Sequence, residues 1–118
     1  MPFHELYIRG TAANLQHFKE NVGTNLNQNW DFREDEYFDY RYLIFEYQGR
    51  DYPHVSVWVT RKPSEPDCYY VANIVPMDEN VHKITQIQYN NILDFFRGDV
   101  IEAYQRANPQ NEINLGDE

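Results

Sequence analysis

Residues 40–75 read YRYLIFEYQGRDYPHVSVWVTRKPSEPDCYYVANIV, and this stretch decides the fold. Apolar and polar residues alternate in three segments, 40–47, 54–60 and 68–75, and such alternation predicts β-strands that are buried on one face. Residues 48–51 carry a glycine and residues 62–67 carry two prolines, so both segments predict turns. Three consecutive strands joined by short turns indicate an antiparallel meander.

Toward the N-terminus, the pattern predicts one more strand and a helix. Residues 5–9 alternate in the manner of a strand, and Thr11 is suited to cap a following helix. We expect Gly23 to close this helix in a left-handed turn. The helix has one apolar stripe, formed by Leu15, Phe18 and Val22.

Toward the C-terminus, Thr85 and Gln88 have the spacing of a capping box, which predicts the start of a second helix. Gly98 within this helix predicts a kink or close packing. Pro109 ends the helical pattern, and residues 109–118 form a polar tail unless Ile113 and Leu115 add a short edge strand. The apolar face of the helix consists of Tyr89, Ile92, Leu93, Phe96, Val100 and Tyr104.

The expected order is therefore β-α-β-β-β-α, an α+β fold in a single domain spanning residues 1–108. It is a two-layer sandwich in which two helices cover one face of a mainly antiparallel sheet of four to five strands. The first helix provides the crossover, which is right-handed by rule. An additional strand near Trp30 is an alternative, because residues 31–39 predict either a bulged strand or an acidic loop.

Composition limits the classes of function. The net charge of −9 and a pI near 4.8 argue against direct binding of nucleic acid, because nucleic-acid-binding proteins concentrate Lys and Arg. No apolar run approaches the ~20 residues of a membrane span, and the first ten residues lack the layout of a signal peptide. A single cysteine, Cys68, fits a reducing compartment, so a cytoplasmic location is expected.

No motif predicts a metal or a cofactor. None of the four histidines lies three or four residues from another histidine or cysteine. His54 and Ser56 form a His-x-Ser strand motif that resembles one half of the two-histidine phosphoesterase signature, in which imidazole is the acid or base and the hydroxyl binds phosphate. A second motif is lacking, since His82 and Thr85 have the wrong spacing, and no basic cluster is evident for phosphate. An enzyme is therefore the least favoured interpretation.

Two other candidates for chemistry favour structural interpretations. Cys68 is a conceivable nucleophile if His54 lies on the neighbouring strand, but the adjacent Asp67 would raise its thiol pKa, which favours a small core residue. The acids of residues 34–39 lack the spacing and the glycine of a calcium loop. His17, between polar neighbours, is expected to be solvated.

Aromatic residues are the most distinctive feature, with ten tyrosines, seven phenylalanines and two tryptophans in 118 residues. Phe18, Phe45, Phe96 and Trp58 are expected in the core. Alternation places Tyr40 and Tyr42 opposite Leu43 and Phe45, so both sets cannot face the helices. Tyrosines beside carboxylates are typical of protein-binding surfaces. The predicted partner-binding residues are Glu34, Asp35, Glu36, Tyr37, Asp39, Tyr40 and Tyr42.

The leading hypothesis is a small, non-catalytic interaction protein of bacterial accessory type, like an immunity, antitoxin or inhibitor protein. It would bind a basic protein partner through the acidic and aromatic surface of residues 31–47. One alternative is an aromatic-lined pocket for a small ligand, formed by Tyr42, His54, Ser56 and Trp58. Another is a homodimer formed through the free face of the sheet.

Overall fold

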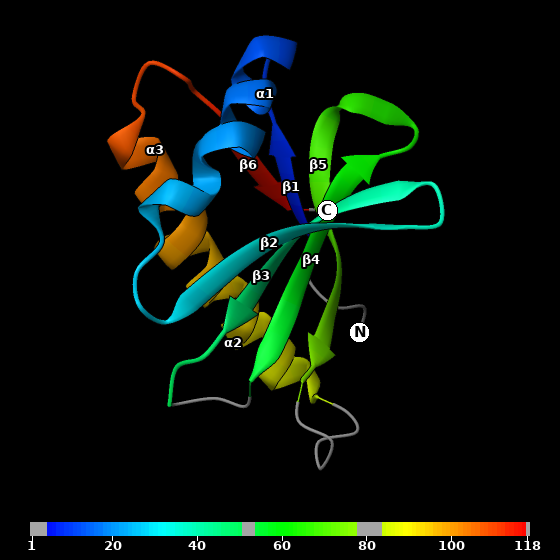
Figure 1. Cartoon of the computed structure of the whole chain (residues 1–118), viewed down its shortest axis with the longest axis vertical. Coiled ribbons are helices and arrows are strands. Elements are labelled where there is room, and N and C mark those ends of the chain that lie inside the picture. Colours follow the sequence, from blue (N-terminus) through cyan, green and yellow to red (C-terminus); the bar gives the residue numbers. More distant parts are fainter. Residues whose placement is uncertain (1–4, 51–53, 78–83, 118) are drawn as a thin grey trace.

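The computed structural model describes residues 5–50, 54–77 and 84–117, which form a two-layer α+β fold (Figure 1). The strands are β1 Leu6–Arg9, β2 Trp30–Tyr37, β3 Tyr40–Tyr47, β4 Val55–Lys62, β5 Glu65–Pro76 and β6 Asn114–Asp117. The helical elements are α1 Ala12–Asn21, the 3-10 turn η1 Val22–Asn25, α2 Gln86–Phe96, the π-helical segment η2 Arg97–Glu102 and α3 Ala103–Ala107. The predicted fold class is confirmed, with six strands where four to five were expected.

The six strands form one antiparallel sheet in the order β2-β3-β4-β5-β1-β6. The meander predicted for β3, β4 and β5 is confirmed, and β2 extends it to four strands. After β1 the chain passes through α1 to β2 at the opposite edge of the sheet. Of the two alternatives for residues 109–118, the short edge strand is present, because β6 pairs with β1 and Ile113 is buried.

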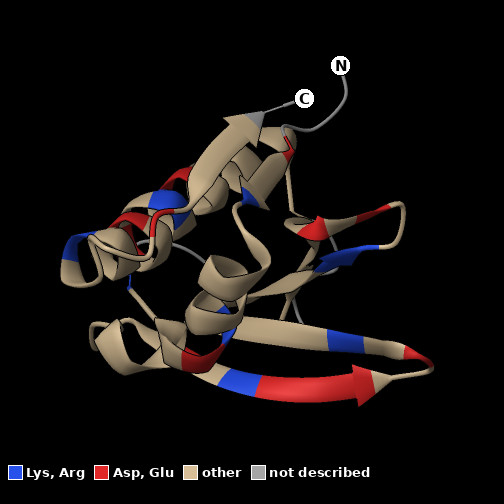
Figure 2. Ribbon diagram, turned by 90° about the horizontal axis from the view of Figure 1, so that it is seen from above, with Lys and Arg blue, Asp and Glu red and all other residues tan. Residues whose placement is uncertain are grey.

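The core lies between the helices and one face of the sheet, hereafter the helix-covered face (Figures 1 and 2). Alternation in the strands sends Leu43, Phe45 and Tyr47 into this core, whereas Tyr40, Tyr42 and Ile44 point to the other face. We call this second face the open face, because no helix in the described ranges packs on it. Phe96 and Phe45 meet edge to face at 5.0 Å, and such contacts join the two layers.

Both helix starts follow their predicted caps. The Thr11 hydroxyl accepts a hydrogen bond from the Asn14 amide at 3.1 Å, and Thr85 and Gln88 form the complete capping box. Gly98 does not pack closely, because a methyl group there would meet nothing within 4 Å. Instead the helix passes through η2, whose wider turn buries both Val100 and Ile101.

Several local predictions were wrong. Residues 30–37 are a regular strand, neither bulged nor a loop, since β2 stays in continuous register with β3. The predicted turn at residues 62–67 is short: Lys62 pairs with Glu65, and Pro66 lies in the bulge that follows, where no ladder hydrogen bond is needed. Gly23 is not left-handed. It lies in η1, where a methyl group would approach the Phe32 ring to 2.6 Å.

Two side chains also differ from expectation. His17 is not simply solvated, because its Nδ1 lies 2.7 Å from the hydroxyl of the fully buried Tyr104. Trp58 is half-buried on the open face instead of lying in the core between the layers. His4, His82 and the end of the turn at residues 48–51 lie outside the described ranges.

Candidate functional site

The candidate site is the hairpin formed by β2 and β3, residues 30–47, which we call the acidic hairpin. It carries six carboxylates and two arginines, and β2 is an edge strand of the sheet. Figure 2 shows acidic residues along β2 where it projects from the body of the protein. Strand edges offer unpaired backbone groups, and charged side chains on them prevent indiscriminate pairing.

The predicted site residues do not all share one surface. The register pairs Asp35 with Tyr42 and Tyr37 with Tyr40, so these four side chains belong to the open face. Glu34 and Glu36 alternate with them and point to the opposite side of β2. The hairpin therefore presents acidic groups on two sides and tyrosines on one.

At the tip of the hairpin, a two-residue turn consisting of Phe38 and Asp39 joins the strands. Phe38 is 97% exposed and has a φ of 55°, which favours glycine or asparagine over other residues. Tyr37 and Tyr40 on either side of the turn are also exposed. Phe38 was not among the predicted binding residues, because its exposure depends on the turn falling at this position.

The open face carries an aromatic cluster. Its members are Tyr37, Tyr40, Tyr42 and Trp58. The Trp58 ring lies 5.1 Å from Tyr37 and 5.2 Å from Tyr42, and Tyr40 lies 6.4 Å from Tyr42, measured between ring centroids. Trp58 Nε1 is buried and donates no hydrogen bond to any described residue. The cluster stiffens the end of the hairpin next to the turn, since tilted and edge-to-face aromatic pairs are attractive.

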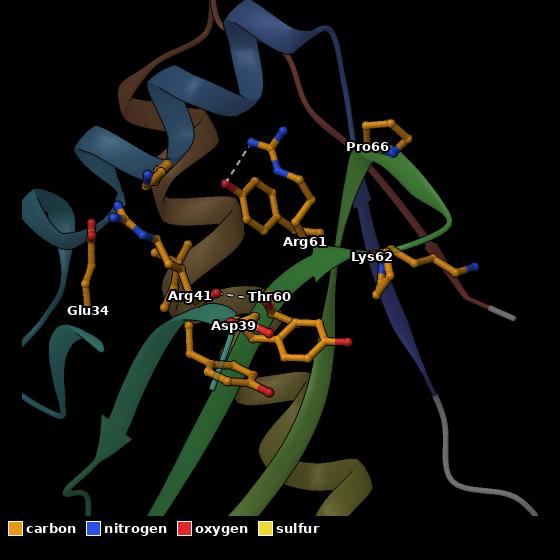
Figure 3. A pocket seen from close by; sticks show the side chains of 13 residues that line it. Glu34, Asp39, Arg41, Thr60, Arg61, Lys62 and Pro66 are labelled. Atoms are coloured by element: carbon orange, nitrogen blue, oxygen red, sulfur yellow. Dashed lines mark hydrogen bonds between the residues drawn. The ribbon is translucent and has the colours of Figure 1, made fainter. Parts of the chain in front are cut away.

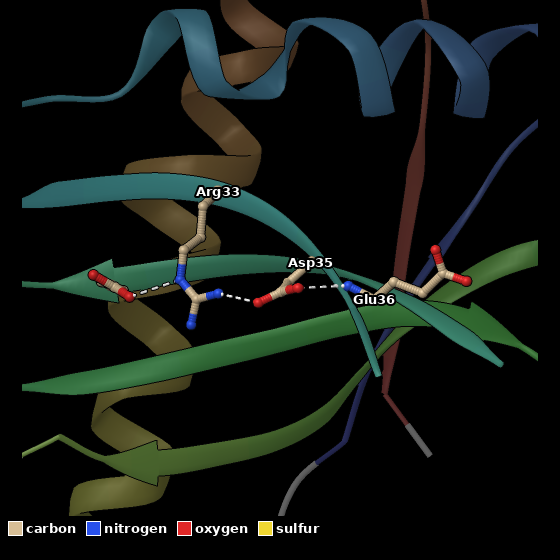
Figure 4. A network of polar contacts seen from close by, with 4 residues as sticks. Arg33, Asp35 and Glu36 are labelled. Carbon is tan, nitrogen blue, oxygen red and sulfur yellow. Dashed lines mark hydrogen bonds and ion pairs between the residues drawn. The ribbon is translucent and has the colours of Figure 1, made fainter. Parts of the chain in front are cut away.

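A polar network crosses the hairpin beside this cluster (Figure 4). Arg33 Nη1 donates to Asp35 at 2.7 Å and Arg33 Nε donates to Glu46 at 3.1 Å, while Asp35 also accepts from the Glu36 amide at 2.8 Å. The backbone N–H of Glu36, followed by hydrogen bonds from Tyr37 and Arg33, lowers the pKa of the Asp35 carboxyl below its usual value. Asp35 and Glu46 are thus partly neutralised by Arg33.

The negative charge of Glu34, Glu36 and Asp39 is offset less by arginine. Glu36 lies 3.9 Å from Arg41 in a weak exposed pair. Within the described ranges, Glu34 and Asp39 form no ion pair. Glu34, Asp35, Glu36 and Arg41 line a small hollow of about 260 Å³, in which carboxylates outnumber arginine three to one. Such a hollow favours a cationic group.

The alternative pocket residues are divided, because Tyr42 and Trp58 belong to the aromatic cluster near the hairpin tip, whereas His54 and Ser56 lie farther from it. Ser56 and Trp58 both belong to the open face, but Ser56 is only 6% exposed, so its hydroxyl is covered. His54 is exposed just before β4. Cys68 lies at the opposite end of β4 and β5 from His54, so these two residues cannot act as a nucleophile and base pair. Burial raises the pKa of the Cys68 thiol, in agreement with a core residue.

Within the described ranges, no three histidine, cysteine or acidic side chains come together as a metal site would require. The same residues contain no helix with the length and apolar character needed to cross a bilayer. The chain matches no protein-family model, no curated protein and no solved structure.

Proposed function

We propose that the protein is a non-catalytic interaction module and that the acidic hairpin binds a basic protein partner. The observation that carries this proposal is the almost fully exposed Phe38 at the tip, held at a φ of 55°. Neither burial nor backbone preference accounts for phenylalanine here, because the ring contributes little to the core and the backbone favours glycine. An exposed aromatic group beside polar residues is typical of an interface anchor.

Charge decides the kind of partner. The hairpin has a net charge of −4 from its six carboxylates and two arginines, and Glu34, Glu36 and Asp39 extend it into solvent. A basic surface would be attracted to these groups, whereas an acidic one would be repelled. In this arrangement Phe38 enters an apolar depression of the partner, and a lysine or arginine of the partner occupies the hollow beside Glu34 and Glu36.

Two charge-matched variants test this proposal. In the hairpin variant, four acids become their amides: Glu34→Gln, Asp35→Asn, Glu36→Gln and Asp39→Asn. In the control variant, four exposed acids outside the hairpin change in the same way: Glu20→Gln, Asp67→Asn, Asp94→Asn and Glu102→Gln. Both variants have a net charge four units less negative than the −9 of the natural chain.

The measurement is co-purification from the source organism, followed by titration of the purified partner at several salt concentrations. We expect the natural chain and the control variant to bind with similar affinity and a steep salt dependence, and the hairpin variant to bind weakly with a flat one. A separate Phe38→Ser variant should weaken binding at every salt concentration. Equal binding by the hairpin and control variants would refute the proposed surface.

Self-association is a second candidate, favoured by the aromatic cluster on the open face. Tyr37 and Tyr40 are 41% and 46% exposed there, and a second copy could cover both rings. The charge of −9 on each copy opposes such a dimer, so it should strengthen as salt rises. Sedimentation across a hundredfold range of protein concentration decides the matter, since a monomer throughout removes this candidate.

A further inference from the structure

A second candidate site lies between the ends of two hairpins (Figures 1 and 3). Pairing of β3 with β4 stops at Tyr42 and Thr60, whereas the acidic hairpin continues to Tyr37 and Tyr40, and the β4–β5 hairpin continues to Lys62. The two hairpin ends therefore separate and leave a cleft of about 460 Å³. Pockets of this size accommodate small organic ligands.

One hydrogen bond fixes the point at which the hairpins separate. The Thr60 hydroxyl donates to the backbone carbonyl of Arg41 at 2.8 Å, in place of a further ladder bond between the strands. Thr60 itself is buried. A buried hydrogen bond thus holds the base of the cleft, and the side chains that line it come from four elements: α1, the acidic hairpin, β4 and β5.

The cleft concentrates positive charge in an otherwise acidic protein. Of the ten lysines and arginines in the chain, four line it, together with only two of the nineteen acids. The cations are Lys19, Arg41, Arg61 and Lys62, and the acids are Glu34 and Asp39. Only Arg61 and Lys62 are adjacent in sequence, so the fold creates a basic cluster that the sequence conceals.

The two acids that line the cleft do not neutralise these cations. Among the described residues, no ion pair joins a cation of the cleft to Glu34 or Asp39. Arg61 instead lies over the Tyr69 ring at 5.3 Å and donates to its hydroxyl at 3.3 Å, which orients the guanidinium without cancelling its charge. Lys62 lies over the Tyr7 ring at 4.7 Å. Arg41 forms the weak exposed pair with Glu36 described above, whereas Lys19, Arg61 and Lys62 form no ion pair among the described residues, so their three charges are available to a ligand.

We propose that this cleft binds a small aromatic phosphate monoester, such as a nucleoside monophosphate. A phosphate monoester carries a charge of about −1.5 to −2 at neutral pH, so the cations of the cleft attract it more strongly than they attract a single carboxylate. Arginine forms paired hydrogen bonds with phosphate oxygens. The half-exposed Tyr40 ring at the rim offers a stacking surface for the aromatic part of the ligand.

The test is calorimetric titration of the natural chain with adenosine 5′-monophosphate, adenosine and inorganic phosphate. We expect the nucleotide to bind measurably, and adenosine and phosphate to bind at least tenfold more weakly, because each lacks one half of the recognised chemistry. Absence of nucleotide binding at millimolar concentration would overturn the proposal. Adenosine binding as tightly as the nucleotide would overturn the phosphate site, and phosphate binding as tightly would overturn the aromatic contact.

Three single variants locate the site. Arg61→Gln and Lys19→Gln each remove one cation from the cleft, on separate elements, and should weaken nucleotide binding about tenfold or more. Arg106→Gln removes the same charge from the exposed surface of α3 and should bind like the natural chain. If all three variants bind equally, the nucleotide is not held in this cleft. Circular dichroism melts confirm that each variant is folded.

This inference is independent of the proposed protein partner. Arg61 and Lys19 lie outside the acidic hairpin, so their variants should retain partner capture while losing the nucleotide. The four-acid hairpin variant should do the reverse, since it removes Glu34 and Asp39 and makes the cleft more positive. The two proposals can therefore fail separately.

Discussion

The positive φ of Phe38 allows the effect of the turn conformation on stability to be measured separately from the effect of the phenylalanine ring. An L-residue in the left-handed region costs about 1–2 kcal/mol relative to the right-handed one, and glycine is free of this cost. Glycine also makes the unfolded chain more flexible, which cancels about 0.4–1 kcal/mol of this gain in stability. Phe38→Gly should therefore increase the free energy of unfolding by about 0.5–1 kcal/mol.

The matched control is Phe38→Ala, which removes the ring but keeps the Cβ atom. Because Phe38 is 97% exposed, the ring contributes almost nothing to stability, and this variant should unfold within about 0.5 kcal/mol of the natural chain. Urea unfolding with shared slopes measures both differences. In thermal melts the glycine variant should gain about 2–4 °C.

Two results would refute this reasoning. If Phe38→Ala destabilises the protein by more than about 1 kcal/mol, the ring is packed and cannot be a free anchor. If the glycine and alanine variants unfold alike, the turn does not hold a positive φ at this position. A stabilised Phe38→Gly variant that also loses partner binding would show that stability is sacrificed here for recognition.

Three further predictions concern the scaffold. Gly23→Ala should destabilise the fold by about 1–3 kcal/mol in urea unfolding because its methyl group meets the Phe32 ring, and adding Phe32→Leu should recover part of the loss. Thr85→Ala should cost about 1 kcal/mol by removing the cap of α2, again measured in urea. Burial raises the pKa of the Cys68 thiol, so iodoacetamide at pH 8 should alkylate it far more slowly in the folded protein than in urea, as followed by mass spectrometry.

The sequence predicted the layers of this fold well because burial acts on alternate residues. Leu43 and Phe45 are apolar on one side of β3 and reach the core, and the spacing of Thr85 and Gln88 alone determines a cap. The edge strand β2 was harder to predict. Much of both its faces is exposed, so its acids carry no apolar periodicity from which a strand could be recognised.

The candidate sites were predicted less completely, since they depend on where strand pairing ends. The sequence located the acidic hairpin through its composition, but Trp58 was assigned to the core and Phe38 was not included among the binding residues. The basic cleft escaped prediction because Lys19, Arg41 and Arg61 are far apart in the chain and meet only where two hairpins separate. No local pattern of residues encodes that separation.

The π-helical segment η2 shifts the direction in which side chains point along one continuous helix. Upstream of it, Phe96 packs against β3, and downstream Tyr104 packs edge to face on Phe18 of α1 at 5.1 Å. A π turn holds about one residue more than an α turn. The side chains after it therefore point in a different direction from the one that an uninterrupted α-helix would give them. Because of residues 97–102, a single helix can pack apolar side chains both on the sheet and on α1, which lie in different directions from its axis.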